Sequence, residues 1–153
     1  MKKIVDHVFC KLMMVLALGL AAGCATKAPW YGVSKKAELM SFGTPDEIRE
    51  FPKGRLELIK FSGGATIGRA TFQPGWRWST SVQPLAKTKS CEAPHFQYHV
   101  SGVLHVRMND GTELDCKPGD VSLLPAGHDG WVVGNEPVVV VDFQGMTNYA
   151  KTK

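Results

Sequence analysis

The feature that most constrains this fold is a close succession of tight-turn signals in the second half of the chain. Asn109-Asp110-Gly111 and Lys117-Pro118-Gly119-Asp120 each separate two short runs of mixed apolar and polar residues. Glycine after Asn or Asp is typical of hairpin turns, and short runs of this kind between turns are typical of strands. The chain is therefore predicted to be all-β, with its strands packed as a sandwich or barrel of the jelly-roll kind.

Further strands are expected before and after these turns. They are predicted at residues 55–61, 65–72, 95–100, 103–108, 112–116, 121–124, 131–133 and 138–143. Two stretches have weaker patterns. Thr44-Pro45-Asp46-Glu47, within residues 37–53, is able to cap a single helical turn. Residues 76–89 lack clean alternation, which indicates a long loop or an edge strand.

The N-terminal residues carry a targeting pattern. A lysine-containing start is followed by the apolar run 12–20, which is too short for a permanent transmembrane span. The run ends in Leu20-Ala21-Ala22-Gly23-Cys24, which resembles the lipobox of bacterial lipoproteins, with alanine where that motif prefers leucine. An ordinary secretory signal with a chance cysteine is the alternative.

The lipobox resemblance implies that residues 1–23 are a lipoprotein signal peptide and that Cys24 is lipidated. More than one acyl chain on Cys24 gives a stable anchor in the lipid bilayer. Ala25 and not aspartate follows, which by resemblance to sorting in two-membrane bacteria implies the outer membrane, with the protein facing the periplasm. Residues 24–50 are then a tether and N-terminal extension, and residues 51–153 form the β-barrel domain.

The chain after residue 23 is close to neutral. Residues 1–23 hold three of the 18 Lys and Arg and one of the 14 Asp and Glu. No basic stripe with interleaved aromatic residues is left, which argues against a nucleic-acid partner. Cys91 and Cys116 remain in an oxidising compartment where cysteines pair, but a disulfide also needs a geometry that sequence spacing does not give. Their pairing is left open.

The spacing of turn residues in the second half resembles the cupin superfamily. Five residues separate Gly119 from Pro125, and one residue separates Pro125 from Gly127. This spacing is similar to the second cupin motif. Six residues separate His95 from Gly102. This spacing is similar to the end of the first motif, in which a glutamate usually stands at the position of His95. The resemblance covers residues 69–143. It implies a small RmlC-like jelly-roll barrel that has room for one small ligand and that commonly pairs into a homodimer.

The metal ligands of the family transfer only in part. Metal cupins take two histidines and a glutamate from the first motif and one histidine from the second. His95 stands at the glutamate position, and Lys89 and Cys91 stand at the first-motif histidine positions. Gly130 stands at the second-motif position, two residues after His128. Protonated lysine cannot ligate a metal, whereas imidazole and thiolate can. The resemblance therefore implies His95, His128 and Cys91 as metal ligands.

Strand alternation adds a geometric constraint. If residues 95–100 form a strand, His95 and His99 share a face but lie ~13 Å apart, which is too far for one mononuclear centre. His128 has the same parity as Gly130, so it faces the barrel interior if its strand begins early. Gln97 or water would complete the ligand set. The residues expected to line the pocket are Gln97, His99 and Trp131.

Structural explanations compete with metal binding at each position. His95 is also consistent with a hydrogen-bonded core imidazole, His128 with a turn residue bonded to backbone, and Cys91 with a small buried hydrophobe. If the three side chains do ligate a metal, their nitrogen and sulfur atoms with one open position suit zinc or copper better than iron.

The expected function is that of a membrane-anchored periplasmic cupin-domain lipoprotein that binds a divalent metal or a small molecule inside its barrel. A metal-dependent enzyme of oxygenase or isomerase type and a non-catalytic envelope scaffold are the alternatives. The departures at Lys89, Cys91 and Gly130 count against the enzyme, which needs a well-held metal. The retained His95 and His128 count against the scaffold, because buried imidazoles without partners are costly. The sequence identifies no substrate and no catalytic residue.

Overall fold

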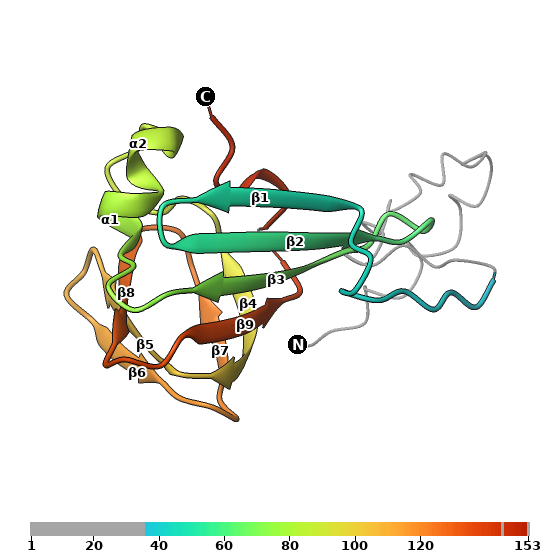
Figure 1. Ribbon diagram of the computed structural model, residues 1–153. Coiled ribbons are helices and arrows are strands. Elements are labelled where there is room, and N and C mark those ends of the chain that lie inside the picture. The colour runs from blue at the N-terminus through green and yellow to red at the C-terminus, as the bar shows by residue number, and fades with distance from the viewer. Residues whose placement is uncertain (1–35, 145, 153) are drawn as a thin grey trace, which may run out of the picture.

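The computed structural model describes residues 36–144 and 146–152, and these form two antiparallel sheets (Figure 1). The first sheet has the strand order β1-β2-β3-β9-β4-β7, and the second has the order β6-β5-β8. The strands are β1 Glu47–Phe51, β2 Gly54–Lys60, β3 Thr66–Phe72, β4 His95–Ser101, β5 Val103–Met108, β6 Glu113–Cys116, β7 Val121–Leu124, β8 His128–Val133 and β9 Val138–Asp142. The helical turns are α1 Trp78–Ser81, α2 Gln83–Ala86 and η1 Met146–Asn148.

The two sheets enclose an apolar core. Leu56 and Leu58 of β2 and Val138 and Val140 of β9 have no exposed surface, and in β9 these buried residues alternate with half-buried ones. The register places Val140 of β9 opposite both Ala70 of β3 and His99 of β4, so β9 joins the two halves of the larger sheet. The all-β, jelly-roll-type barrel predicted from the sequence is confirmed.

The turn between β4 and β5 requires a glycine. Gly102 has a φ of +66°, and a Cβ built there would lie 2.7 Å from the carbonyl oxygen of Pro137. An L-residue would be strained by the backbone and would also clash with the chain that enters β9. This glycine therefore fixes the point at which the chain passes from the larger sheet to the smaller one.

The structure differs from the sequence prediction in two segments. Thr44 to Glu47 caps no helix, and β1 begins at Glu47, ahead of residue 51, where the barrel domain was expected to start. The segment 76–89 is neither a plain loop nor an edge strand, because it contains the two single-turn helices α1 and α2. Figure 1 shows these turns at one end of the barrel, where α1 contacts β8.

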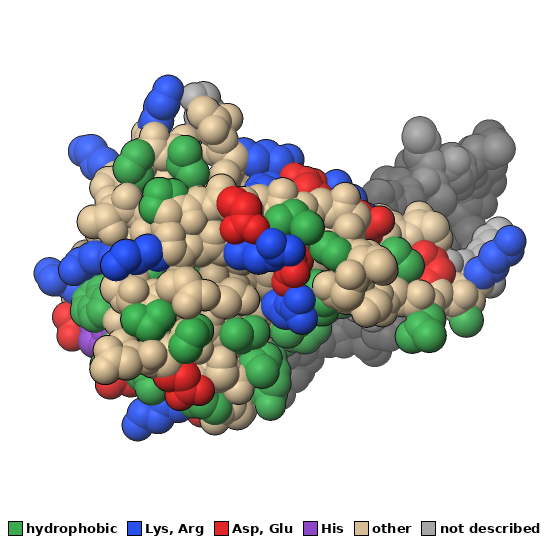
Figure 2. Space-filling view, viewed as in Figure 1, with side chains coloured by type: hydrophobic (Ala, Val, Ile, Leu, Met, Phe, Trp, Pro, Cys, Tyr) green, Lys and Arg blue, Asp and Glu red, His purple; other side chains and the backbone are tan. Residues whose placement is uncertain are grey.

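The surface mixes charges of both signs. Lys and Arg side chains lie next to Asp and Glu side chains on the face shown in Figure 2, without a continuous basic stripe on that face. The predicted signal peptide and the lipidation site Cys24 lie outside the described residues. Within the part of the chain that the structure describes, no helix is long and apolar enough to cross a membrane.

Candidate metal centre

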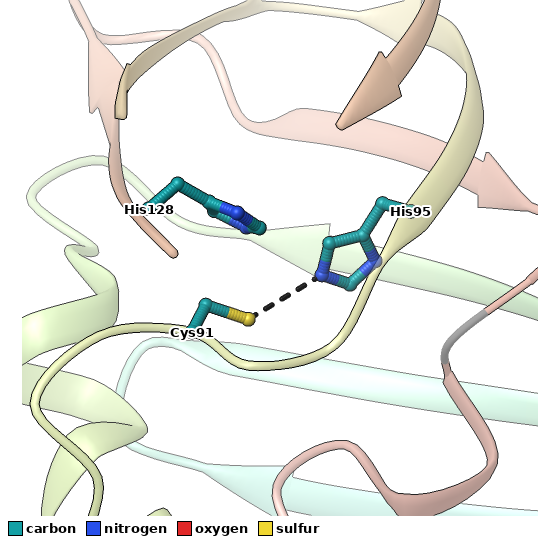
Figure 3. A group of neighbouring side chains, drawn as sticks. All are labelled: Cys91, His95 and His128. Carbon is teal, nitrogen blue, oxygen red and sulfur yellow. Dashed lines mark hydrogen bonds between the residues drawn. The ribbon is translucent and has the colours of Figure 1, made fainter. Parts of the chain in front are cut away.

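Three side chains that are separated along the chain come together inside the barrel. Cys91 lies in the loop before β4, His95 is the first residue of β4, and His128 is the first residue of β8 (Figure 3). Each offers one ligand atom, and these atoms all lie within 4.8 Å of one another. The exposed fractions of Cys91, His95 and His128 are 2%, 3% and 5%, so the cluster is shielded from bulk water.

Backbone hydrogen bonds fix the positions of Cys91 and His128. The Cys91 amide donates to the His128 carbonyl at 2.8 Å, and the Gly127 amide donates to the Cys91 carbonyl at 2.7 Å. β8 begins at His128, which the β5–β8 register pairs with Met108, and this is the early strand start needed for His128 to face inward. Strand alternation in β4 points His95, Gln97 and His99 inward and leaves Tyr98 half-exposed, as predicted.

The Nδ1 atoms of both histidines are held by acceptors. His95 Nδ1 lies 2.5 Å from Asp142 Oδ2, and His128 Nδ1 lies 2.9 Å from the Pro125 carbonyl oxygen. This hydrogen-bond network assigns the Nδ1 proton in each ring, because a carboxylate and a carbonyl can only accept. Each Nε2 is then the nitrogen available for a metal. A hydrogen bond from the second ring nitrogen to a carboxylate or a carbonyl is the usual support of a metal-ligating histidine.

Asp142 is the residue of this centre that the sequence prediction missed. It is the last residue of β9, it is fully buried, and the β4–β9 register places it opposite Gln97. Asp142 Oδ2 also accepts a 3.0 Å hydrogen bond from Gln97 Nε2, and Asp142 Oδ1 accepts one of 2.6 Å from the Gln144 amide. The sequence signal for Asp142 was a carboxylate directly after the apolar run Val138–Val141. A charged residue is rarely buried without partners, so a carboxylate at this position indicates a polar partner inside the barrel.

The cluster stabilises separated charges on sulfur and imidazole. Burial alone would raise the pKa of Cys91, but hydrogen bonds with His128 and His95 outweigh it and lower this pKa to about 6. Burial alone would lower the pKa of His95, but Asp142 and Cys91 outweigh it and raise this pKa to about 9. Near neutral pH, Cys91 and His95 therefore form a thiolate–imidazolium pair.

The spacing of the Cys91 and His95 donor atoms fits a tetrahedral metal site. Cys91 Sγ and His95 Nε2 lie 3.5 Å apart. For bonds of ~2.1 Å to nitrogen and ~2.3 Å to sulfur, two ligands of a tetrahedral site are about 3.6 Å apart. One thiolate and two imidazoles make up three ligands, so a four-coordinate ion held here would keep one position open.

Two cavities adjoin the cluster. An inner cavity of about 30 Å³ is bordered by all three candidate ligands and by Gln97. An outer groove of about 700 Å³ lies between the α1–α2 segment and the C-terminal residues 147–152. Cys91, Trp78 and Tyr149 border both, so these three residues form a wall that the groove and the inner cavity share.

The other predicted pocket residues are distributed differently. Gln97 borders the inner cavity, but His99 is fully buried and its Nε2 lies 2.8 Å from Ser122 Oγ. Trp131 lies on the outward face of β8, where it stacks with His105 and under Arg77, so it does not line this cavity. Cys91 and Cys116 are both free and buried, so the two do not form a disulfide.

Comparison with known proteins gives matches in structure only. No protein-family model matches this chain, and no curated protein matches its sequence. A protein of unknown function from Rhizobium leguminosarum bv. viciae matches with a TM-score of 0.53 at 17% identity, over 71% of this chain and 96% of its own. An RmlC-like cupin from Shewanella frigidimarina matches with a TM-score of 0.48 at 19% identity, over 71% of this chain and 92% of its own.

A third solved structure is much longer than this chain. The oxalate decarboxylase–formate complex from Lactobacillus farciminis matches with a TM-score of 0.49 at 19% identity, over 65% of this chain and 30% of its own. The Rhizobium match shows a shared fold. The layout of two antiparallel sheets confirms the all-β architecture predicted from the sequence.

Proposed function

We propose that the barrel is a metal-binding module that holds one transition-metal ion through Cys91, His95 and His128. The observation that carries this proposal is the convergence of two imidazoles with a thiolate, while the Nδ1 atom of each imidazole is already hydrogen-bonded to an acceptor. A buried imidazole that only packs in a core does not require this arrangement, because it is stable with one hydrogen-bonded nitrogen and an apolar neighbour.

Zinc and copper are the ions that this donor set favours. A thiolate with two imidazoles is a soft to intermediate ligand set, whereas magnesium, calcium and manganese prefer oxygen ligands. The Asp142 carboxylate is committed to His95, Gln97 and Gln144, so it supports the ligands and does not add an oxygen to the metal. The site is therefore proposed to bind zinc or copper in preference to iron.

Metal analysis of the purified protein by plasma mass spectrometry tests this proposal. We expect near-stoichiometric metal in the wild type and a large loss in His95→Ala and in His128→Ala. His105→Ala is the matched control. The Nδ1 atom of His105 also lies 2.7 Å from a carboxylate oxygen, Asp115 Oδ1, but His105 has no thiol partner. Absence of metal after incubation with zinc and with copper would refute the proposal and leave a scaffold as the better explanation.

A metal-dependent enzyme is the second candidate, and the outer groove favours it. The groove of about 700 Å³ is within the size range of small-molecule sites and ends at Cys91. When bound, the metal would supply Lewis-acid chemistry at its open position. Trp78 and Tyr149 would hold an organic molecule at the mouth, and the buried core would exclude bulk water. Screening small organic molecules against metal-loaded and metal-free protein separates this candidate from metal binding alone.

We also propose that the chain is a lipoprotein anchored in the outer membrane and facing the periplasm. The run that ends in Gly23-Cys24, followed by Ala25, supports this proposal. Replacing Cys24 with serine should move the protein from the membrane fraction to the soluble fraction. Persistence of Cys24→Ser in the membrane fraction would refute lipidation as the anchor.

A homodimer is proposed through the outward face of β4 and β7. Tyr98 and Val100 of β4 are 42% and 46% exposed, and Val121 and Leu123 of β7 are 63% and 73% exposed. The edge strand β7 has one side without a strand partner among the described residues, which makes it suited to pair with a second copy. Light scattering should show a dimer in the wild type and a monomer in Leu123→Glu; a wild-type monomer would refute the proposal.

A further inference from the structure

Gln97 is held in one orientation beside the proposed ligands. It lies on the inward face of β4, two residues after His95, and is buried. Its Nε2 donates to Asp142 Oδ2, the same oxygen that interacts with His95 Nδ1. A flipped amide would place two acceptor oxygens against each other, so the carboxylate fixes the NH₂ end of Gln97 on Asp142. The amide oxygen then points away from Asp142.

The Gln97 oxygen has no donor among the described residues. Gln97 Oε1 is buried without a hydrogen bond, although Gln97 borders the inner cavity together with Cys91, His95 and His128. Buried polar atoms without partners are rare in native proteins, and each calls for an explanation such as a bound ligand. Gln97 therefore presents an unused acceptor at the cavity.

Trp76 presents the complementary donor. Its ring is buried, stacks on Phe72 with a centroid distance of 3.9 Å, and borders the same cavity. Trp76 Nε1 is also buried without an acceptor in the described part of the chain. The Trp76 carbonyl accepts from the Val132 amide, so the backbone of this residue is fixed and its indole N–H is the group that remains.

The size of the cavity limits what these two groups can bind. The inner cavity measures about 30 Å³, which is room for a group about the size of water. Such a group is stable in a buried site when it has two to four polar partners. An acceptor at Gln97, a donor at Trp76 and a metal ion would supply three. A larger organic molecule fits only in the outer groove.

We infer that the inner cavity binds a water-sized protic ligand at the open position of the metal, and that this ligand donates to Gln97 Oε1 and accepts from Trp76 Nε1. This inference rests on the proposed metal site. The ligand class is a small molecule with at least one O–H or N–H, such as water or ammonia. A water-sized anion without a hydrogen, such as fluoride, faces the lone pairs of Gln97 Oε1 and binds less well.

Fluoride titration of the cobalt-loaded full-length protein tests this inference, because fluoride is about the size of water and carries no hydrogen. Absorption bands of the cobalt–thiolate group report metal binding, and their shift with fluoride gives the fluoride affinity. We expect Gln97→Met to bind fluoride at least tenfold more tightly than the wild type, because the repelling oxygen is gone. Trp76→Phe is the matched variant, which keeps an aromatic ring but lacks the N–H. Because water and fluoride both accept a hydrogen bond from that N–H, the fluoride affinity of Trp76→Phe should change less than threefold.

The outcomes separate the inference from the proposed function. A wild type without the cobalt–thiolate band would overturn the metal site and, with it, the inference. Equal fluoride affinity in the wild type and Gln97→Met, both with the band, would overturn the inference alone. Loss of the band in Gln97→Met would show that Gln97 is needed for metal binding, which also overturns the proposed role. On the wild type itself, electron spin echoes of cobalt in D₂O should show deuterons coupled more strongly than those on the two histidine Nδ1 atoms, as expected for a ligand bound directly to the metal; absence of these strongly coupled deuterons would overturn the inference.

Discussion

Metal binding to this centre should release a number of protons that depends on pH. In the metal-free protein Cys91 has a pKa of about 6 and His95 one of about 9, so between these values the pair holds one proton, on the imidazole. Asp142 accepts from Nδ1, so the proton that a metal must displace is the one on Nε2. Changing the pH therefore changes the apparent metal affinity by a calculable amount.

The magnitude follows from the two pKa values. Removing the His95 proton at pH 7 costs about 3 kcal/mol, because its pKa of about 9 lies two units higher and each unit is about 1.4 kcal/mol. The apparent dissociation constant should thus fall about tenfold per pH unit between about pH 6 and pH 9 and level off above that. Below about pH 6 Cys91 is protonated as well, and the dependence should approach a hundredfold per unit.

Titration calorimetry in buffers of different ionisation enthalpy measures the released protons directly. At about pH 7.5 we expect zinc to release about one proton from the Cys91–His95 pair. Asp142→Asn should release less than one, because loss of the carboxylate removes the main interaction that raises the pKa of His95. Binding of zinc without proton release, or with an affinity that stays constant from about pH 6.5 to 8.5, would refute the thiolate–imidazolium pair.

Three further predictions concern the stability of the metal-free protein. The raised pKa of His95 contributes stability that is lost as pH rises through about 9, and the lowered pKa of Cys91 contributes stability that is lost as pH falls through about 6. Between about pH 6.5 and 9 these slopes cancel, so denaturant unfolding should show no net pH dependence from the pair; a slope near 1.4 kcal/mol per pH unit would contradict this. Leu56→Ala should lower the unfolding free energy by about 2–5 kcal/mol in the same assay, because it leaves a cavity in the core. Gly102→Ala should lower the midpoint of thermal unfolding, because its Cβ would lie 2.7 Å from the Pro137 carbonyl oxygen; an unchanged midpoint would show that the turn relaxes.

The fold was readable from the sequence where local signals decide it. Asn109-Asp110-Gly111 set a hairpin between β5 and β6, and the inward face of β4 followed from strand parity alone. The short helices α1 and α2 were not readable, because one turn of helix has too few residues to establish a periodicity. Strand β1 was missed because only Ile48 and Phe51 are apolar in it, and its pairing with β2 decides its conformation.

The sequence predicted only those residues of the centre that motif positions and strand parity identify. Cys91, His95 and His128 were named from their motif positions and strand parity, and the structure brings these three together. Asp142 was not named, because it is 47 residues from His95 and meets it only through the pairing of β4 with β9. Trp131 was assigned to the pocket from its residue type, whereas its parity in β8 is opposite to that of His128 and turns it outward.

The centre also contains the series of groups that activates a nucleophilic cysteine. This series is the thiolate of Cys91, the imidazole of His95 and the carboxylate of Asp142. The position of His128 argues for the metal, because a nucleophile needs one base and a metal needs several donors. The alkylation rate of Cys91 with iodoacetamide distinguishes these roles. A metal-ligating sulfur should be alkylated in the metal-free protein and protected by one equivalent of zinc. Equally fast alkylation with and without zinc, in protein that retains the zinc, would show that the sulfur is not a ligand. Cys91 would then act as a nucleophile at the end of the outer groove, with His95 holding its proton.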